Sequence, residues 1–298
     1  MELHIIFNPT ANHGKSVHLM KRLERYLRHH KIKYYFHATQ YVGHATDIAH
    51  MLTSKKDRKI HLFAVGGDGT ANEVLNGIIN FDNLLFSIIP AGSGNDFIDN
   101  FKEDYSDVVD TLKRQIENRK KWRYIDFIDV NDSKVRCLNV LGFGIDTEII
   151  ERYNSKKWFS PKYRYKMATI AKAINFNVHD VSFKKDRNNI YMDREIIIFV
   201  VCNGRKFGGG LIASNHAEID DGKLTISYVR KFERIKTIPY MQKMLKVGID
   251  KLKTSNWFDC KSLVLKMRRP IYQVDGQLKT DTNVLEIKVV HNKLKYVA

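Results

Sequence analysis

One segment determines the architecture: Leu62-Phe63-Ala64-Val65-Gly66-Gly67-Asp68-Gly69-Thr70-Ala71-Asn72-Glu73-Val74-Leu75-Asn76-Gly77. Its apolar start predicts a buried strand, its glycines predict a tight turn, and the remainder predicts a helix. Such a turn exposes backbone N–H groups beside the positive end of the helix dipole, where phosphate binds. Thr70 and Glu73 have the spacing of a capping box, which predicts where the helix starts.

Two further polar loops that contain glycine follow predicted strands. Asn8-Pro9-Thr10-Ala11-Asn12-His13-Gly14-Lys15-Ser16 follows the apolar run Leu3–Phe7, and Pro90-Ala91-Gly92-Ser93-Gly94-Asn95-Asp96-Phe97 follows Leu84–Ile89. In a parallel sheet such loops meet at the carboxyl edge, where ligands bind. A P-loop requires glycine where this chain has Pro9, and the G-x-G-x-x-G fingerprint of dinucleotide-binding enzymes is absent after the first strand. Both of those classes are therefore excluded.

Together, the three loops resemble the diacylglycerol kinase catalytic-domain family, which includes bacterial soluble lipid kinases and the sphingosine and ceramide kinases. Later motifs follow in the family's order: Gly142-Phe143-Gly144-Ile145-Asp146, Asp220-Asp221-Gly222 and Val274-Asp275-Gly276. NAD kinases and phosphofructokinases share only the Gly-Gly-Asp-Gly-Thr element. The Asn72-Glu73 extension and the 92–97 loop therefore favour the lipid-kinase branch.

The order of the expected elements indicates two domains. Residues 3–90 alternate between strands and helices and are followed by a helix over 105–118, which predicts a parallel, three-layer α/β nucleotide-binding domain at 1–122. Strands and polar turns dominate 123–288, with helices over 163–176 and 233–253, which predicts an antiparallel β domain. The resemblance implies a β-sandwich-like substrate domain there, an active site in the cleft between domains, and a last strand at 289–298 that completes the first domain.

The resemblance also implies which residues contact the nucleotide or orient the loops around its phosphates. They are Asn8, Pro9, Thr10, Thr39, Gly66, Gly67, Asp68, Gly69, Thr70, Asn72, Glu73, Ser93, Asn95 and Asp96. Mg²⁺ keeps several waters and takes one or two carboxylates, so Asp68, Asp96 and Asp126 are candidate ligands, and Asp68 is counted as catalytic. Ordinary turn capping is the alternative role for Asn95 and Asp96.

Two acidic residues in the second half match further positions of the family. Asp275 matches the proposed general base, which would accept the proton of the substrate hydroxyl. Members commonly carry Glu two residues later, where this chain has Gln277, so one negative charge is missing. Asp221 matches a structural Mg²⁺ site, to which Glu218 and Lys223 would contribute backbone carbonyls. An ordinary Asp-Gly turn is the alternative.

The charge of the chain predicts a polyanionic partner, because 50 Lys and Arg residues against 33 acidic residues give a net charge of +17. No helix-turn-helix, zinc-finger or RNP signature is present, so an anionic membrane surface is expected rather than nucleic acid. Two basic clusters are candidates for this contact. One comprises Lys21, Arg22, Arg25 and Arg28 in the first helix, and the other is the basic and aromatic segment 156–166.

Several features predict a cytoplasmic protein that is peripheral at the inner membrane face. The longest apolar run, Ile196–Cys202, is too short to span a bilayer, and the first strand begins too early to leave room for a signal peptide. Cys137, Cys202 and Cys260 lack metal-ligand spacing and suit a reducing compartment.

The combined expectation is an ATP- and Mg²⁺-dependent lipid kinase that transfers the γ-phosphate to a hydroxyl of diacylglycerol or a related lipid substrate. A kinase for a soluble acceptor, in the manner of NAD kinases, is one alternative. A catalytically silent regulator that binds nucleotide or lipid is another, motivated by Gln277.

Overall fold

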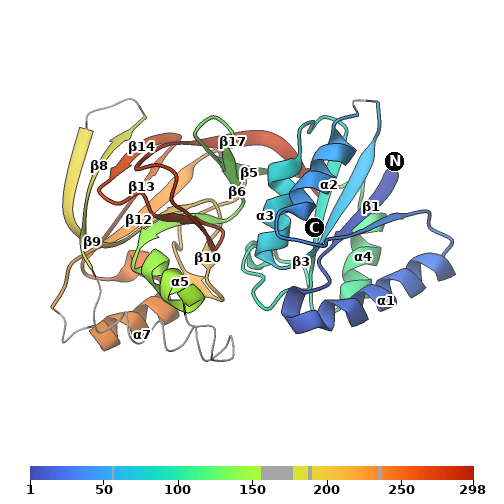
Figure 1. Ribbon diagram of the computed structural model, residues 1–298, viewed down its shortest axis with the longest axis horizontal. Helices are drawn as coiled ribbons and strands as arrows, with labels where there is room; N and C mark the ends of the chain where they lie inside the picture. Colours follow the sequence, from blue (N-terminus) through green and yellow to red (C-terminus); the bar gives the residue numbers. More distant parts are fainter. Residues whose placement is uncertain (56, 156–176, 187–189, 234–236) are drawn as a thin grey trace. The chain divides into compact units, whose positions relative to one another are not determined.

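The structure is a computed structural model that describes residues 1–55, 57–155, 177–186, 190–233 and 237–298 (Figure 1). The chain divides into two compact units. Unit 1 comprises 1–127, 219–222 and 290–298, and unit 2 comprises 128–218 and 223–289. The sequence-based division at 122 and 123 differs from this boundary by a few residues, and it assigned the turn 219–222 to the other domain.

Unit 1 contains a parallel sheet with helices on both faces, as the alternating pattern predicts. Its strand order is β17-β4-β3-β1-β2. The elements in chain order are β1 (Glu2–Phe7), η1 (Ala11–Gly14), α1 (Lys15–His29), β2 (Tyr35–Ala38), α2 (His44–Thr53), β3 (Ile60–Gly66), α3 (Asp68–Gly77), β4 (Leu84–Pro90), η2 (Ile98–Asn100) and α4 (Val108–Glu117).

Alternation of side chains along the strands divides the core of unit 1 between two layers of helices. Ile5, Phe63 and Ile89 pack with Leu23 of α1 and Leu112 of α4 in one buried cluster. Helices α2 and α3 lie side by side (Figure 1). Their close approach is possible because α3 ends in Gly77, where an added Cβ would lie 2.2 Å from the carbonyl oxygen of Thr46.

Asp107 fixes both the start of α4 and its position beside α1. Its Oδ1 accepts hydrogen bonds from the N–H groups of Val109 at 2.7 Å and Asp110 at 3.1 Å, which satisfies N–H groups that a helix start leaves unpaired. Its Oδ2 accepts a hydrogen bond from the Arg22 guanidinium of α1, and this contact lowers the pKa of Asp107. Arg22 is thus committed to an intramolecular contact.

The capping box expected at Thr70 and Glu73 is wrong. Helix α3 begins at Asp68, and Gly67, at the N-cap position, makes no side-chain cap. The Thr70 hydroxyl instead accepts a hydrogen bond from Asn8 Nδ2 at 3.3 Å. The glycine turn therefore leads directly into the helix, and Asp68 supplies the negative charge that favours a helix N-terminus.

The chain end adds a strand to the sheet of unit 1. Tyr296 of β17 (Val284–Tyr296) is opposite Phe86 in parallel pairing, and the Val297 N–H donates to the Phe86 carbonyl at 3.0 Å. The buried Ser87 hydroxyl donates to the Val297 carbonyl at 2.9 Å, and His61 Nε2 lies 2.9 Å from the same hydroxyl. Burial lowers the pKa of His61 to about 3, so the imidazole is neutral in this network.

Unit 2 is an antiparallel β structure, with the strand order β16-β15-β7-β9-β8-β14-β17 and with β12 pairing both β9 and β13. Its elements, after β5 (Arg123–Val130), are β6 (Val135–Cys137), β7 (Val140–Gly144), α5 (Ile145–Ser155), β8 (His179–Lys185), β9 (Ile190–Cys202), β10 (Lys206–Phe207), β11 (Leu211–Ile212), β12 (Leu224–Arg230), α7 (Thr237–Val247), η4 (Ile249–Lys251), β13 (Ser255–Cys260), β14 (Ser262–Met267), β15 (Tyr272–Val274) and β16 (Gln277–Lys279). The expected combination of a parallel α/β domain with a β-sandwich-like domain is confirmed.

Two helix predictions in this half have different outcomes. The helix expected over 163–176 lies outside the described residues. The helix expected over 233–253 is shorter, because α7 ends at Val247 and Gly248 has a φ of 102°, which an α-helix does not accommodate. Within the described ranges, no helix is both long enough and apolar enough to cross a bilayer. The three cysteines are free thiols in buried positions.

Candidate functional site

Two glycine-rich loops meet at the carboxyl edge of the sheet in unit 1. Strands β3 and β4 pair in parallel with Gly66 opposite Pro90, so the loops that follow them start side by side. A Cβ added to Gly92 would lie 2.3 Å from the Gly67 Cα and 2.8 Å from its nitrogen. Only glycine fits at position 92, because any side chain would overlap the backbone of the other loop.

The Asp68 carboxylate joins these two loops. Its Oδ2 accepts the N–H of Asp96 at 2.9 Å, and its Oδ1 accepts the N–H of Phe97 at 3.1 Å. Asn95 closes its own loop, since its side chain accepts from the Gly92 N–H at 3.2 Å and donates to the Gly92 carbonyl at 3.1 Å. Asn95 therefore makes the turn-capping contacts that were the alternative to a ligand role.

A cavity with a volume of about 240 Å³ opens beside the first turns of α3. The loop after β1 and helix α3 contribute polar side chains, which are Asn8, Thr10, Thr70 and Glu73. The loop after β2 and the start of α2 contribute Thr39, Gln40, Tyr41, Val42 and Ala45. Since the strand order is β3-β1-β2, the cavity runs along the carboxyl edge from the glycine turn towards the edge strand.

Asn8 organises the polar side of this cavity. Its Oδ1 accepts hydrogen bonds from the backbone N–H of Thr10 at 3.0 Å and from the Thr10 hydroxyl at 2.8 Å. Its Nδ2 donates to the Thr70 hydroxyl at 3.3 Å, so one amide connects the loop after β1 with α3. The Ser16 hydroxyl donates to the Asn8 carbonyl at 2.9 Å and holds the loop from the other side.

The structure brings five of the residues expected at the nucleotide together as lining of the cavity: Asn8, Thr10, Thr39, Thr70 and Glu73. Others form the two joined loops beside it, and Asn72 is buried within α3, where its side chain accepts from Asn76 Nδ2 at 3.0 Å. Sequence analysis did not identify Gln40, Tyr41, Val42 and Ala45 as lining residues. Only their position could have identified them in the sequence, because they follow β2 in the same way that the other loops follow their strands.

The donor atoms on the polar side of the cavity are compatible with Mg²⁺. Glu73 contributes a carboxylate, and Thr10 and Thr70 contribute hydroxyl oxygens, which are the ligand types of a hard cation. Among the described residues no cluster of three or more His, Cys, Asp or Glu side chains is placed to hold a metal ion. This pattern suits an ion that is held by one carboxylate together with substrate phosphates.

Asp126 is engaged by protein groups within unit 1. Its Oδ2 accepts the Gly222 N–H at 2.7 Å, its Oδ1 lies 2.7 Å from His291 Nδ1, and its own N–H donates to the Ile219 carbonyl at 2.6 Å. Burial raises the pKa of Asp126, and the contacts with Gly222 and His291 oppose that rise. These contacts make Asp126 an anchor for the turn 219–222, which contains Asp221.

The residues expected at a structural Mg²⁺ differ in exposure. Asp221 is half-buried, whereas Glu218 and Lys223 are exposed. Gly222 has a φ of 71°, the left-handed conformation of an Asp-Gly turn. The proposed cation site at this turn stays a prediction.

Asp275 occupies a nest of backbone donors in unit 2. Its carboxylate accepts N–H groups from Leu138 at 2.7 Å, Asn139 at 3.0 Å and Val140 at 3.0 Å, and the Cys137 thiol lies 3.2 Å from Oδ1. Burial raises the pKa of Asp275, while these donors act against the rise. In this arrangement Asp275 holds the chain between β6 and β7.

Asp146, in the first turn of α5, is a second buried carboxyl group of unit 2. It is only 7% exposed, and neither of its oxygens has a hydrogen-bond partner in the described part of the chain. Burial raises its pKa to about 6, an effect that the Thr147 N–H and the nearby Gln273 amide partly offset. A carboxyl group with such a pKa can exchange a proton near neutral pH.

Comparison with known proteins agrees with this architecture. The diacylglycerol kinase catalytic domain model matches residues 2–127, and the YegS C-terminal NAD kinase beta sandwich-like domain model matches residues 139–297. The chain belongs to the diacylglycerol kinase catalytic-domain family. The resemblance seen in the motifs is thereby confirmed over both halves of the chain.

Individual relatives are distant. The chain is 29% identical to YtlR of Bacillus subtilis over 148 residues, 48% of each chain, and so spans about half the length of this relative. It is 28% identical to a diacylglycerol kinase of Bacillus subtilis over 233 residues, 76% of this chain and 73% of that protein. A crystal structure of a diacylglycerol kinase from Bacillus anthracis has a TM-score of 0.74 at 22% identity, with coverage of 99% of this chain and 96% of that chain, which shows a shared fold.

Proposed function

We propose that this protein is an ATP- and Mg²⁺-dependent lipid kinase that phosphorylates a hydroxyl of diacylglycerol or a related lipid. The observation that carries the proposal is the polar cavity beside the joined glycine loops, in a chain of the diacylglycerol kinase family. The triphosphate of ATP would lie at the N-terminus of α3, where backbone N–H groups and the helix dipole favour negative charge.

The residues of the chain would position the phosphates and accept the proton of the acceptor hydroxyl. Thr70, whose hydroxyl accepts from Asn8, would donate its own proton to a phosphate oxygen, and Asn8 would hold Thr10 beside it, while Asp68 keeps the two glycine loops in register. Mg²⁺, when bound near Glu73, would neutralise charge on the transferred phosphate. Asp275 is the family-matched candidate for the general base, and the buried Asp146 is a second candidate on chemical grounds.

The decisive experiment is transfer of labelled γ-phosphate from ATP to lipids in anionic mixed micelles, with and without Mg²⁺. Labelled phosphatidic acid or another labelled phospholipid, formed only with Mg²⁺, is the expected result. Transfer to a soluble polyol or nucleotide in place of lipid would favour the soluble-acceptor alternative. ATP binding without transfer to any acceptor would favour the silent regulator suggested by Gln277.

The reaction is proposed to take place at an anionic membrane on the cytoplasmic face. Of the two basic clusters, the one on α1 lies among the described residues. Lys21, Arg25 and Arg28 are exposed, whereas Arg22 pairs with Asp107. The second basic cluster, 156–166, lies outside the described residues. Each basic side chain near an anionic leaflet contributes about 1 kcal/mol, so a few of them support reversible binding.

Charge reversal on α1 tests this membrane contact. The double variant Lys21→Glu and Arg25→Glu is expected to reduce sedimentation with phosphatidylserine vesicles at least about tenfold, because two positive charges near the surface become negative. Reversal of Lys253 and Lys261 in unit 2 is the matched control for net charge. Equal loss in both double variants would show that overall charge, and not α1, governs binding.

A further inference from the structure

We infer that Tyr41 is the stacking platform for the base of the nucleotide, and that the loop 40–44 forms the base subsite of the cavity. This assignment rests on the proposed nucleotide function and adds to it the orientation of the ligand. The base would lie between the edge strand β2 and the start of α2, and the triphosphate would extend towards the glycine turn.

The chemistry of the cavity differs along its length. Near α3 its lining is formed by an amide, two hydroxyls and a carboxylate, from Asn8, Thr10, Thr70 and Glu73. Beside β2 and α2 the polar Thr39 and Gln40 are followed by Tyr41, Val42 and Ala45, which are aromatic or apolar. A nucleoside triphosphate has the same division, because a charged phosphate chain is joined to a flat, weakly polar base.

The aromatic side chain of Tyr41 is largely exposed to solvent at the cavity. Its residue is 57% exposed, and the adjacent Val42 is 90% exposed, although both line the cavity. Exposed apolar side chains gathered at a cavity mark a binding surface more often than scattered ones do. Stacking a base on the ring would cover this apolar surface.

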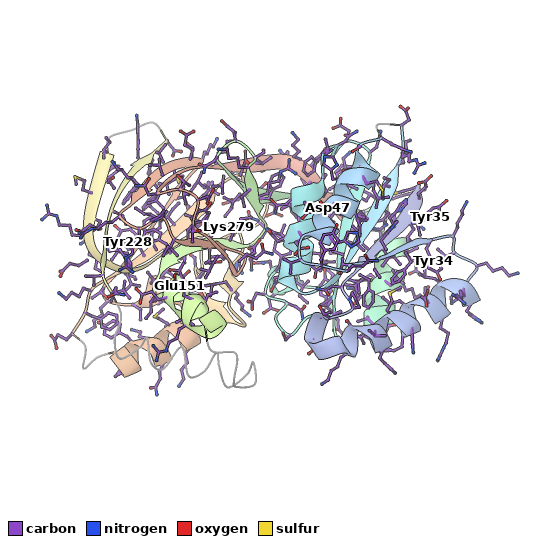
Figure 2. All side chains as sticks on the ribbon, in the orientation of Figure 1. Tyr34, Tyr35, Asp47, Glu151, Tyr228 and Lys279 are labelled. Atoms are coloured by element: carbon purple, nitrogen blue, oxygen red, sulfur yellow. The ribbon has the colours of Figure 1, made fainter. Side chains whose placement is uncertain are left out.

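The ring of Tyr41 is held in place before any ligand arrives. It stacks on the His44 imidazole with 4.5 Å between ring centroids and 14° between planes. The Tyr41 hydroxyl donates to Asp47 Oδ2 at 2.9 Å, and Figure 2 labels Asp47 on α2. His44 covers one face of the ring, and the 57% exposure of Tyr41 at the cavity leaves surface for a second flat group. Because the ring is already held, little conformational entropy would be lost on binding.

The backbone of the loop is fixed by the same residues. The Gln40 N–H donates to His44 Nδ1 at 3.0 Å, and the His44 N–H donates to the Tyr41 carbonyl at 3.2 Å. Gly43 has a φ of 90° at the N-cap of α2, and an added Cβ there would meet no atom within 4 Å. The loop therefore turns sharply into α2 and presents Tyr41 as part of a rigid element.

Binding of two ligands separates the base contact from the phosphate contact. Tyr41→Ala is expected to raise the Kd for ATP with Mg²⁺ about 5- to 100-fold, the loss caused by removing one base-aromatic stack. The Kd for inorganic tripolyphosphate with Mg²⁺ should change less than about twofold, because that ligand has no base. Tyr41→Phe keeps the ring and should stay close to the wild-type Kd for ATP.

Tyr35 provides a matched control for Tyr41. Tyr35, labelled on β2 in Figure 2, is an aromatic residue of the same unit that is 38% exposed but does not line the cavity, so Tyr35→Ala should leave both Kd values unchanged. An unchanged Kd for ATP in Tyr41→Ala, or equal weakening of both ligands, would overturn the base assignment alone. Failure of the wild-type protein to bind either ligand would overturn the proposed function itself.

Discussion

Replacing Asp275 with asparagine is expected to lower the free energy of unfolding by about 1–3 kcal/mol, because a carboxylate that satisfies several buried donors is removed. The carboxylate accepts the N–H groups of Leu138, Asn139 and Val140. Asparagine has one acceptor oxygen in place of two, so its NH₂ group would face at least one backbone N–H group that the carboxylate now accepts. Urea unfolding followed by tryptophan fluorescence measures this loss directly.

The same variant tests the proposed general base. If Asp275 accepts the hydroxyl proton, kcat should fall about 10²- to 10⁴-fold at a temperature where the variant is fully folded. Asp186→Asn is the control, because Asp186 also accepts two backbone N–H groups, from Lys261 and Ser262 at 2.8 Å each. That control should lower stability and leave kcat unchanged.

One other result would change the assignment of Asp275. A loss of stability in Asp275→Asn without a loss of kcat would make it a positioning residue only. Asp146 would then be the residue to replace next, because its carboxyl group is buried and its pKa is raised to about 6.

Local sequence was sufficient for the sheet of unit 1. Strands β3 and β4 are apolar apart from His61 and Ser87 and end in glycine or proline, and buried parallel strands have this composition. Helices of unit 1 carry apolar residues at helical spacing, such as Leu23 and Leu27 in α1. The glycine turn after β3 was placed by this order together with its unusual residue types.

Long-range contacts account for the features that sequence analysis missed. The break between β6, which ends at Cys137, and β7, which begins at Val140, is one of them, because the intervening N–H groups bind Asp275 far along the chain. Likewise, the capping box failed because Thr70 bonds to Asn8 of another loop. No pattern within either segment reports such partners.

In the candidate site, too, some residues could be identified from local sequence and others only from long-range contacts. The glycine loops were identifiable because their residue types are unusual, whereas Gln40 and Tyr41 are ordinary loop residues. They line the cavity because β2 pairs with β1 at the sheet edge, with Phe7 opposite Ala38. That pairing is a property of the folded sheet, so the lining could be identified only from the structure.

Substituting alanine for Gly92 is expected to have the second large effect, on the contact between the two glycine loops. The added Cβ would overlap the backbone of Gly67 at 2.3 Å, and backbone atoms on both sides leave no flexible side chain to move away. Overpacking of this kind costs about 1–3 kcal/mol or more, so Tm should fall by several degrees. ATP binding should weaken at least about tenfold, because precise positioning of the loops beside α3 is lost.

Gly94 is the matched control for Gly92, since it lies in the same loop and its nearest neighbour to an added Cβ is Asp68 Oδ2 at 3.9 Å. Gly94→Ala should therefore fold with wild-type stability or gain a few tenths of a kcal/mol, because alanine restricts the unfolded chain. Equal stability and equal ATP binding in Gly92→Ala and Gly94→Ala would contradict the close approach of the loops. A loss confined to Gly92→Ala would mean that the phosphate site depends on backbone contact between these loops, a requirement that explains glycine at 67 and 92 more directly than turn geometry does.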